Sequence, residues 1–120
     1  IWVRYSNLIN SLYLFTTIAQ IAGINVNEYE NSKSFYPLLT QATSNNRTFN
    51  YSEVLNDSPT KSGYTIRDNT YKLLVLDNGT ERFYNLNQDP YETNNIINNL
   101  SNEEQVAYNN LKTEVNLIRE

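Results

Sequence analysis

Cysteine, histidine and methionine are all missing from this sequence of 120 residues. Without cysteine, the chain cannot form a disulfide, a thiolate metal site or a thiol nucleophile. Without histidine, it has neither a Ser-His-Asp triad nor a histidine-based zinc site, and it lacks the usual proton carrier near neutral pH. Without methionine, Ile1 is not a translation start, so we expect an excised fragment of a longer protein, with a mature protein whose leader was removed as the alternative.

Positive charge and long apolar runs are also scarce. The formal net charge is −4 and the nine Lys and Arg residues are scattered singly, so we predict no partner surface for nucleic acid or an anionic membrane. The longest apolar run, Leu73 to Leu76, is far shorter than the roughly 20 residues that span a bilayer. A chain of this length forms one domain at most, with a modest core.

Apolar residues recur at helical spacing near the N-terminus. The pattern predicts a helix from Leu8 to Ala22, with Gly23 as its C-terminal cap. Two apolar stripes imply burial on two sides, so we expect this helix to face a larger domain that is missing here, or to form a dimer. The alternative is the central helix of a small autonomous fold. The stripes are Leu8, Leu12, Phe15, Ala19 and Ala22, and beside them Leu14, Ile18 and Ile21.

Four strand candidates follow a polar connection at residues 25–46, which the apolar segment 35–39 is expected to anchor. They span residues 48–54, 63–67, 71–76 and 80–86. Asn78-Gly79 predicts a type I′ turn, in which both central residues need positive φ. Ser101 and Glu104 have capping-box spacing, which predicts a helix there. The expected fold is α+β: a four-stranded antiparallel sheet packed by a C-terminal helix, with an additional N-terminal helix. The C-terminal helix would bury Ala107, Leu111, Val115 and Ile118.

The end of the last strand has an unusual order of residues. Asp89-Pro90 should end the strand in a turn, because proline offers no N–H and Asp89 can accept hydrogen bonds from the backbone beyond it. The stretch ERFYNLNQDPYETNN, residues 81–95, resembles the closing motif of sulfatases, in which Glu-Leu-Tyr-Asp-Leu is followed by Asp-Pro, Glu and Asn-Asn. Segments 17–24, 34–39, 47–53, 63–67 and 71–73 are similar to the same family in the same order. Departures from the family pattern, which concern the subfamily, occur at Tyr13, Thr16, Asn31-Ser32, Phe83 and Asn85.

The resemblance covers residues 6–118 and implies the C-terminal subdomain of a sulfatase-like hydrolase of the alkaline phosphatase superfamily, with residues 1–120 lacking the catalytic domain. The parent enzyme would hydrolyse sulfate esters with a formylglycine, made from a Cys/Ser-x-Pro-x-Arg motif, and a divalent cation, calcium or magnesium. Phe35, Asp57 and Gln88 stand two positions before the three prolines, so the motif is absent. We expect the chain alone to be inactive, with no catalytic or metal-binding residue. The family implies secretion or a periplasmic location, and the abundance of asparagine favours a bacterial source.

Arg67 and Lys72 are the candidates for binding a sulfated substrate, such as a carbohydrate. They lie where the resemblance is strongest, and Arg offers a sulfate group a planar fork while Lys offers a point charge. In this interpretation the chain has a structural role and lines one wall of the substrate pocket. In the alternative, Lys72 projects to solvent and Arg67 pairs with a carboxylate. Two carboxylate pairs, Asp77 with Glu81 and Glu103 with Glu104, are interpreted as structural.

Ten tyrosines suggest a different class of function, a carbohydrate-binding or adhesion module that stacks sugars on aromatic faces. Tyr51, Tyr64, Tyr71 and Tyr84 all fall in predicted strands. Tyrosines in strands usually pack the ring inside while the hydroxyl reaches water, so we favour the structural interpretation. Three or more rings exposed on one contiguous face would favour the binding module.

Overall fold

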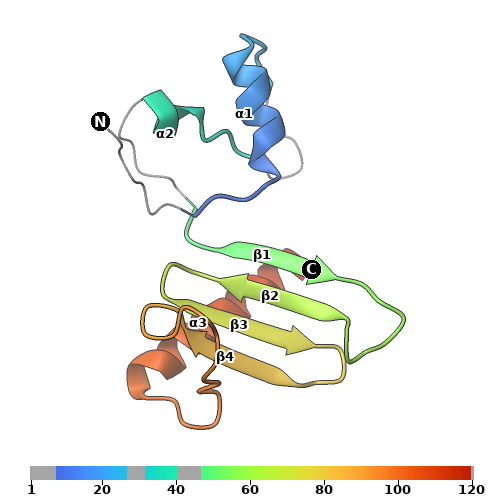
Figure 1. Ribbon diagram of the computed structural model, residues 1–120, viewed down its shortest axis with the longest axis vertical. Coiled ribbons are helices and arrows are strands. Elements are labelled where there is room, and N and C mark those ends of the chain that lie inside the picture. Colours follow the sequence, from blue (N-terminus) through green and yellow to red (C-terminus); the bar gives the residue numbers. More distant parts are fainter. Residues whose placement is uncertain (1–7, 27–31, 41–46, 120) are drawn as a thin grey trace. The chain divides into compact units, whose positions relative to one another are not determined.

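The computed structural model describes residues 8–26, 32–40 and 47–119, which fall into two compact units, Ile1–Thr48 and Phe49–Glu120 (Figure 1). Parts of the predicted connection, residues 27–31 and 41–46, lie outside the described residues. The helices and strands confirm the α+β class. No helix among the described residues is long and apolar enough to cross a membrane.

The second unit contains a four-stranded antiparallel sheet in the order β1-β2-β3-β4. The predicted strand positions are confirmed to within two residues at each end, the usual spread of strand boundaries. Each connection joins neighbours in the sheet, so the sheet is a simple meander (Figure 1). The strands are β1 (Asn50–Val54), β2 (Gly63–Arg67), β3 (Tyr71–Leu76) and β4 (Glu81–Asn85).

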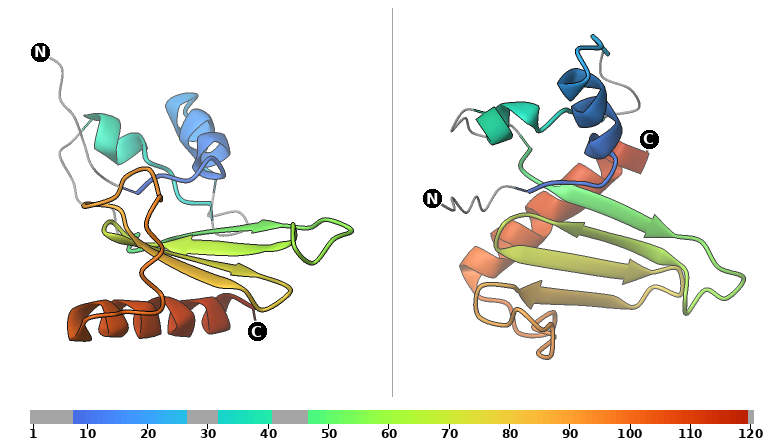
Figure 2. Two further views of the ribbon diagram at one scale, coloured as in Figure 1. Left: turned by 60° about the horizontal axis from the view of Figure 1, so that its bottom comes forward. Right: turned by 45° about the horizontal axis from the view of Figure 1, so that its top comes forward.

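Helix α3 (Asn102–Arg119) covers one face of this sheet (Figure 2). Its predicted capping box is confirmed: Ser101 N–H donates to Glu104 Oε2 at 2.8 Å, and Glu104 N–H donates to Ser101 Oγ at 3.3 Å. The backbone hydrogen bond from Ser101 lowers the pKa of Glu104. Both bonds are local in sequence, which is why the helix start could be predicted from two residue types.

The core lies between α3 and the sheet. Ile66, Leu73 and Phe83 have no exposed surface, and Leu111 and Val115 are each 3% exposed. Alternation along the strands places these side chains on the helix side, while the next residue of each strand lies on the opposite, open face. The prediction that Ile118 is buried was wrong, because it lies in the last turn of the helix, outside the core cluster, and is 43% exposed.

The turn between β3 and β4 differs from the predicted type I′ turn. Gly79 has φ of 84°, but Asn78 does not have positive φ. Leu76 N–H donates to Thr80 O and Gly79 N–H donates to Leu76 O, both at 2.9 Å, which closes a three-residue loop of Asp77, Asn78 and Gly79. Only the third residue of such a loop needs the left-handed conformation. Asn78 contributes through its side chain instead, since its Oδ1 accepts the N–H of Thr80 at 3.0 Å.

The two edges of the sheet are finished differently. Along β4, Phe83 N–H donates to the side-chain Oδ1 of Asn95 at 2.9 Å, and Ile96 N–H donates to Phe83 O at 2.9 Å. The Asn95 amide therefore takes the place of a neighbouring backbone carbonyl. The opposite edge strand is β1, whose last three residues, 52–54, are exposed.

The first unit contains α1 (Tyr13–Ile21) and the short helix α2 (Tyr36–Thr40). The predicted start at Leu8 was wrong, because a hydrogen-bonded turn at Asn10 precedes the helix. The predicted cap at Gly23 is confirmed by its φ of 76°. Gly23 N–H donates to Gln20 O at 3.0 Å and Ile24 N–H donates to Ala19 O at 2.9 Å, the hydrogen-bond pair of a Schellman motif.

The buried side of α1 carries hydroxyl groups. Tyr13, Thr16 and Thr17 are at most 4% exposed. The Thr17 hydroxyl donates to Tyr13 O at 2.6 Å and accepts the N–H of Phe35 at 3.0 Å, and the Thr16 and Ser32 hydroxyls are 2.9 Å apart. These hydrogen bonds offset the loss of water that burying a hydroxyl entails.

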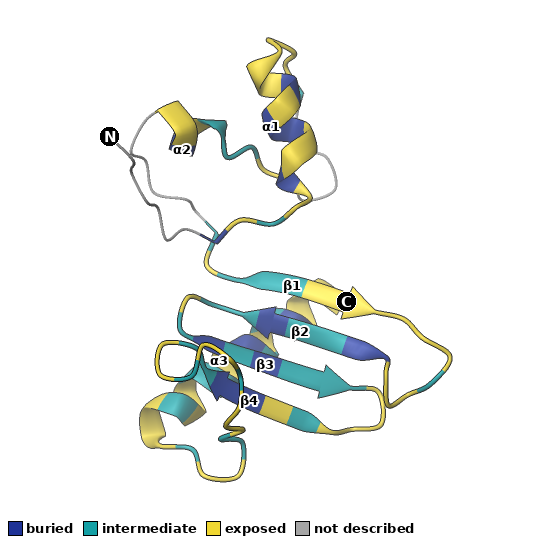
Figure 3. Cartoon of the chain, viewed as in Figure 1, coloured by how far each residue is buried: buried dark blue, intermediate teal, exposed yellow. Residues whose placement is uncertain are grey.

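The predicted apolar stripes of α1 are therefore mostly exposed. Only Leu8 and Ala19 of those residues are buried. Buried and exposed residues alternate along α1 in Figure 3. Within this chain the second stripe, Leu14, Ile18 and Ile21, is exposed throughout. The exposed large residues on and beside α1 are Ile9 (47%), Leu12 (60%), Leu14 (50%), Phe15 (60%), Ile18 (61%), Ile21 (58%) and Ile24 (60%).

Candidate functional site

The two predicted cationic residues are neighbours on the open face of the sheet. Arg67 in β2 and Lys72 in β3 are cross-strand partners, and both are partly buried. The next residues along the strands, Ile66 and Leu73, belong to the core beneath α3, so strand alternation places Arg67 and Lys72 on the other face. The sequence-predicted pair is thus brought together by one turn of the chain.

Lys72 already has an anionic partner. Its Nζ donates to both carboxylate oxygens of Glu92, at 2.8 and 2.7 Å, and the two side chains are 22% and 34% exposed. Glu92 has φ of 58°, a conformation that few residues other than glycine adopt. The ion pair therefore joins β3 to a residue of the loop after β4 that has positive φ. Lys72 does not project freely to solvent, and a sulfate group would have to displace Glu92 to reach it.

Of the two predicted cations, Arg67 is the one that forms no ion pair with the described residues. Its Nε donates to the backbone carbonyl of Asp68 at 3.1 Å. The Asp68 carboxylate is used elsewhere, since its Oδ1 accepts the N–H groups of Thr70 and Tyr71 at 2.7 and 2.6 Å. No carboxylate among the described residues forms an ion pair with Arg67. An arginine guanidinium can in general donate paired hydrogen bonds to an anion such as sulfate.

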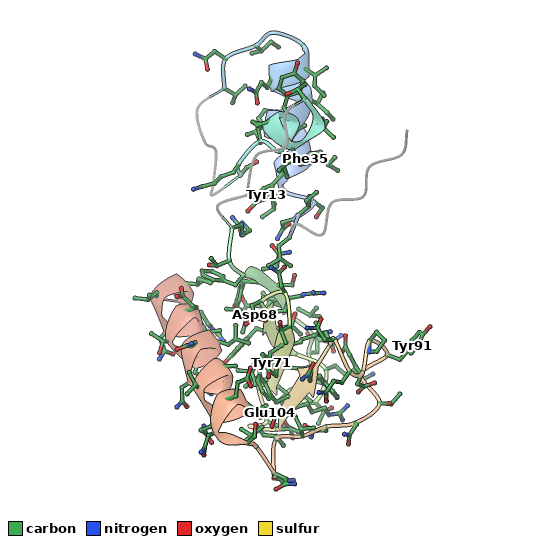
Figure 4. The ribbon with its side chains drawn as sticks, turned by 90° about the vertical axis from the view of Figure 1, so that its left-hand side faces the viewer. Tyr13, Phe35, Asp68, Tyr71, Tyr91 and Glu104 are labelled. Carbon is green, nitrogen blue, oxygen red and sulfur yellow. The ribbon has the colours of Figure 1, made fainter. Side chains whose placement is uncertain are left out.

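In the loop after β4, the Asp-Pro motif fixes the backbone through the Asp89 carboxylate. The Asp89 carboxylate accepts the N–H of Asn94 at 2.8 Å and the hydroxyl of Thr93 at 3.0 Å. Backbone hydrogen bonds from Asn94 and Thr93 lower the pKa of Asp89. At the tip of this loop, Tyr91 is 87% exposed and points away from the sheet on the side opposite α3 (Figure 4). The motif therefore shapes a loop beside Lys72.

A second polar cluster lies on the helix side of the sheet and was missed in the sequence. The Tyr108 hydroxyl donates to Glu81 Oε2 at 2.5 Å, and Lys112 Nζ donates to Glu81 Oε1 at 2.7 Å. Burial alone would raise the pKa of Glu81, but the hydrogen bonds from Lys112 and Tyr108 outweigh it and the pKa is lowered. The spacing of Tyr108 and Lys112 places both on one helix face. Their partner lies too far away in sequence for any local pattern to indicate it.

The carboxylates of the described residues do not form a metal site. No group of three or more Asp or Glu side chains in this part of the chain could hold an ion. One member of each pair considered in the sequence has a structural partner: Glu81 contacts Tyr108 and Lys112, and Glu104 caps α3.

The tyrosines do not form an exposed aromatic face. Tyr5 and Tyr29 lie outside the described residues, and of the others only Tyr91 is exposed. Tyr71 stacks on Phe83 with ring centroids 5.4 Å apart, as expected for a ring that packs into a core. The described part of the chain gives no support to a binding module built on three or more exposed rings.

A family model described as N-sulphoglucosamine sulphohydrolase, C-terminal, matches residues 3–120. A search of the curated proteins found no match. Several solved structures share the fold. One, described as a 2-O GAG sulfatase, is 23% identical with a TM-score of 0.69, and the match covers 88% of this chain and 24% of that one.

Two further structures are similar to the chain. One was solved in complex with its substrate D-glucosamine-2-N,6-O-disulfate and is 22% identical with a TM-score of 0.71, covering 86% of this chain and 22% of that one. Another, from glycosaminoglycan metabolism of Bacteroides thetaiotaomicron, is 15% identical with a TM-score of 0.61, covering 88% and 24%. The chain thus spans about a quarter of these structures. Because the family match extends over nearly all of its residues, the chain belongs to the N-sulphoglucosamine sulphohydrolase C-terminal family, as its resemblance to sulfatases indicated.

Proposed function

We propose that this chain is the C-terminal part of an enzyme that hydrolyses sulfate esters, and that it stabilises the catalytic domain and lines one wall of the substrate pocket. The exposed apolar surface of α1 carries the structural half of this proposal. Leu12, Phe15, Ile18 and Ile21 are each at least 58% exposed. Extended apolar surfaces are rare on soluble monomers. The catalytic domain is the partner that we expect to cover this one.

The pocket-lining half of the proposal rests on Arg67. Its guanidinium lies on the open face of the sheet and has no carboxylate partner among the described residues. A sulfated carbohydrate is the expected substrate, since a structural neighbour was solved with a disulfated glucosamine. Arg67 would contact the sulfate directly, whereas Lys72 would do so only after losing Glu92.

The proposal assigns the chemistry to the missing catalytic domain. That domain would supply the formylglycine and a divalent cation, calcium or magnesium, and the isolated chain would be inactive. A bacterial, secreted or periplasmic enzyme is part of the same proposal. An open reading frame upstream of this chain that lacks both Cys/Ser-x-Pro-x-Arg and an acidic metal cluster would contradict it.

The role of Arg67 is tested in the enzyme that contains this chain. Arg67→Met should raise KM for a sulfated disaccharide, because it removes a charge-assisted contact with the sulfate. Arg82→Met is the matched control, since Arg82 is an exposed cation on the same open face, in β4. Equal kinetics for the two variants would argue against a pocket role for Arg67.

A further inference from the structure

The turn between β3 and β4 contains the only Asn-Gly pair of the sequence. In such a pair, the backbone nitrogen of the glycine can attack the side-chain Cγ of the asparagine. A C–N bond forms and closes a succinimide ring, the Cγ–Nδ2 bond breaks, and ammonia leaves with the proton of the attacking nitrogen. Water then adds to one of the two ring carbonyls, and the bond from that carbon to the ring nitrogen breaks: attack at Cγ yields aspartate and attack at the backbone carbonyl yields isoaspartate, with no oxidant or reductant. Glycine favours the attack because no side chain hinders it.

Both partners of this reaction are exposed to solvent. In addition, a Cβ built at Gly79 would have no atom within 4 Å, so this position of the turn is open. We propose that Asn78 is a site of spontaneous deamidation, and that opening of this turn sets the rate.

The folded turn restrains both reacting groups. Gly79 N–H donates to Leu76 O at 2.9 Å, so the attacking nitrogen keeps its proton in a hydrogen bond. The side-chain Oδ1 of Asn78 is held by the N–H of Thr80 at 3.0 Å. Deamidation therefore requires these bonds to break.

The turn is also fastened to the connection between β1 and β2. Asp77 N–H donates to Ser62 O at 3.1 Å, and Asn78 N–H donates to Pro59 O at 3.2 Å. Local opening must release these bonds as well, and local opening has its own free energy in a folded protein. The rate of deamidation at Asn78 thus reports how often this corner of the sheet opens.

The product would weaken the hairpin. Aspartate or isoaspartate adds a negative charge next to Asp77, and Glu81 follows shortly after in β4. Isoaspartate also adds a backbone carbon to the loop, whose closure depends on the hydrogen bond between Leu76 N–H and Thr80 O. The strain would be transmitted to Glu81, whose carboxylate holds Tyr108 and Lys112 of α3.

The test incubates the 120-residue chain at mildly alkaline pH, folded in buffer and unfolded in urea. Peptide mapping by mass spectrometry locates each conversion of amide to acid, and methylation by an isoaspartyl methyltransferase detects isoaspartate. Asn78 should be the fastest site in urea and about tenfold slower in the folded chain, as expected when the reaction proceeds through local opening. Asn56 and Asn87, exposed and followed by larger residues, serve as internal controls.

Gly79→Ala supplies a chemical control, because the added methyl group should slow the reaction even in urea. Faster deamidation at another asparagine in urea would overturn the assignment of the site. Equal rates at Asn78 in the folded and unfolded chain would overturn the role of the turn.

Discussion

The contact of Glu81 with α3 can be tested by replacing Glu81 with Gln. The substitution keeps the shape of the side chain but removes the charge that accepts hydrogen bonds from Tyr108 and Lys112, at 2.5 and 2.7 Å. A hydrogen bond to a charged group contributes about 1.5–3 kcal/mol when shielded from water. The Glu81 and Lys112 side chains are 24% and 35% exposed, which reduces this value. We therefore expect a loss of about 1–2 kcal/mol of unfolding free energy at pH 7.

The pH dependence gives a sharper test than the magnitude. The pKa of Glu81 is lower in the folded chain than in the unfolded chain, so the unfolded chain binds more protons as the pH falls. The stability due to Glu81 is fully present above about pH 4.3, the ordinary pKa of glutamate, and is lost as the pH falls through the lower folded value. Urea unfolding of both proteins from pH 7 to pH 3 should show their difference shrinking in acid. A difference that stays constant to pH 3 would refute the reasoning. Glu114→Gln is the control, because Glu114 lies on α3 and forms no ion pair with the described residues. This substitution should change the free energy of unfolding little.

Three further substitutions test other parts of the structure. Gly79→Val should lower the urea midpoint, with a cost of about 1 kcal/mol or more, because a β-branched residue resists the φ of 84° found there; an unchanged midpoint would argue against that conformation. Asn95→Ala should lower the free energy of unfolding by about 1–2 kcal/mol, because it leaves the N–H of Phe83 without its acceptor. Hydrogen exchange of the Phe83 amide should accelerate, and protection equal to that of the parent chain would argue against this contact. The isolated chain should self-associate through α1. Ile18→Asp should make it monomeric in sedimentation measurements, since Ile18 is 61% exposed. Val106→Asp, at an exposed position on α3, is the control, and an equal effect of both substitutions would argue against an interface on α1.

Local patterns predicted most of the second unit. The strands and the capping box at Ser101 depend on neighbouring residues, so sequence spacing contains the information that places them. The orientation of α1 could not be predicted in this way. Thr17 is buried because its hydroxyl finds partners at Tyr13 and Phe35, and periodicity of apolar residues does not register such partners.

The candidate site was predictable in part for the same reason. Arg67 and Lys72 are joined by one short turn, so their proximity follows from the hairpin. The ion pair between Lys72 and Glu92 joins residues twenty positions apart across a loop. It depends on the positive φ of Glu92, which no residue type at that position indicated.

The two edge strands of the sheet, β1 and β4, differ in how far they are covered by other parts of the unit. Asn95 and Ile96 both hydrogen-bond to Phe83 on the β4 edge, whereas Val54 at the end of β1 and Leu55 just after it are 59% and 85% exposed. A sheet edge that keeps its peptide groups available is a template for a strand from another molecule. The exposed residues 52–54 of β1 are therefore where we expect a strand from another molecule to add.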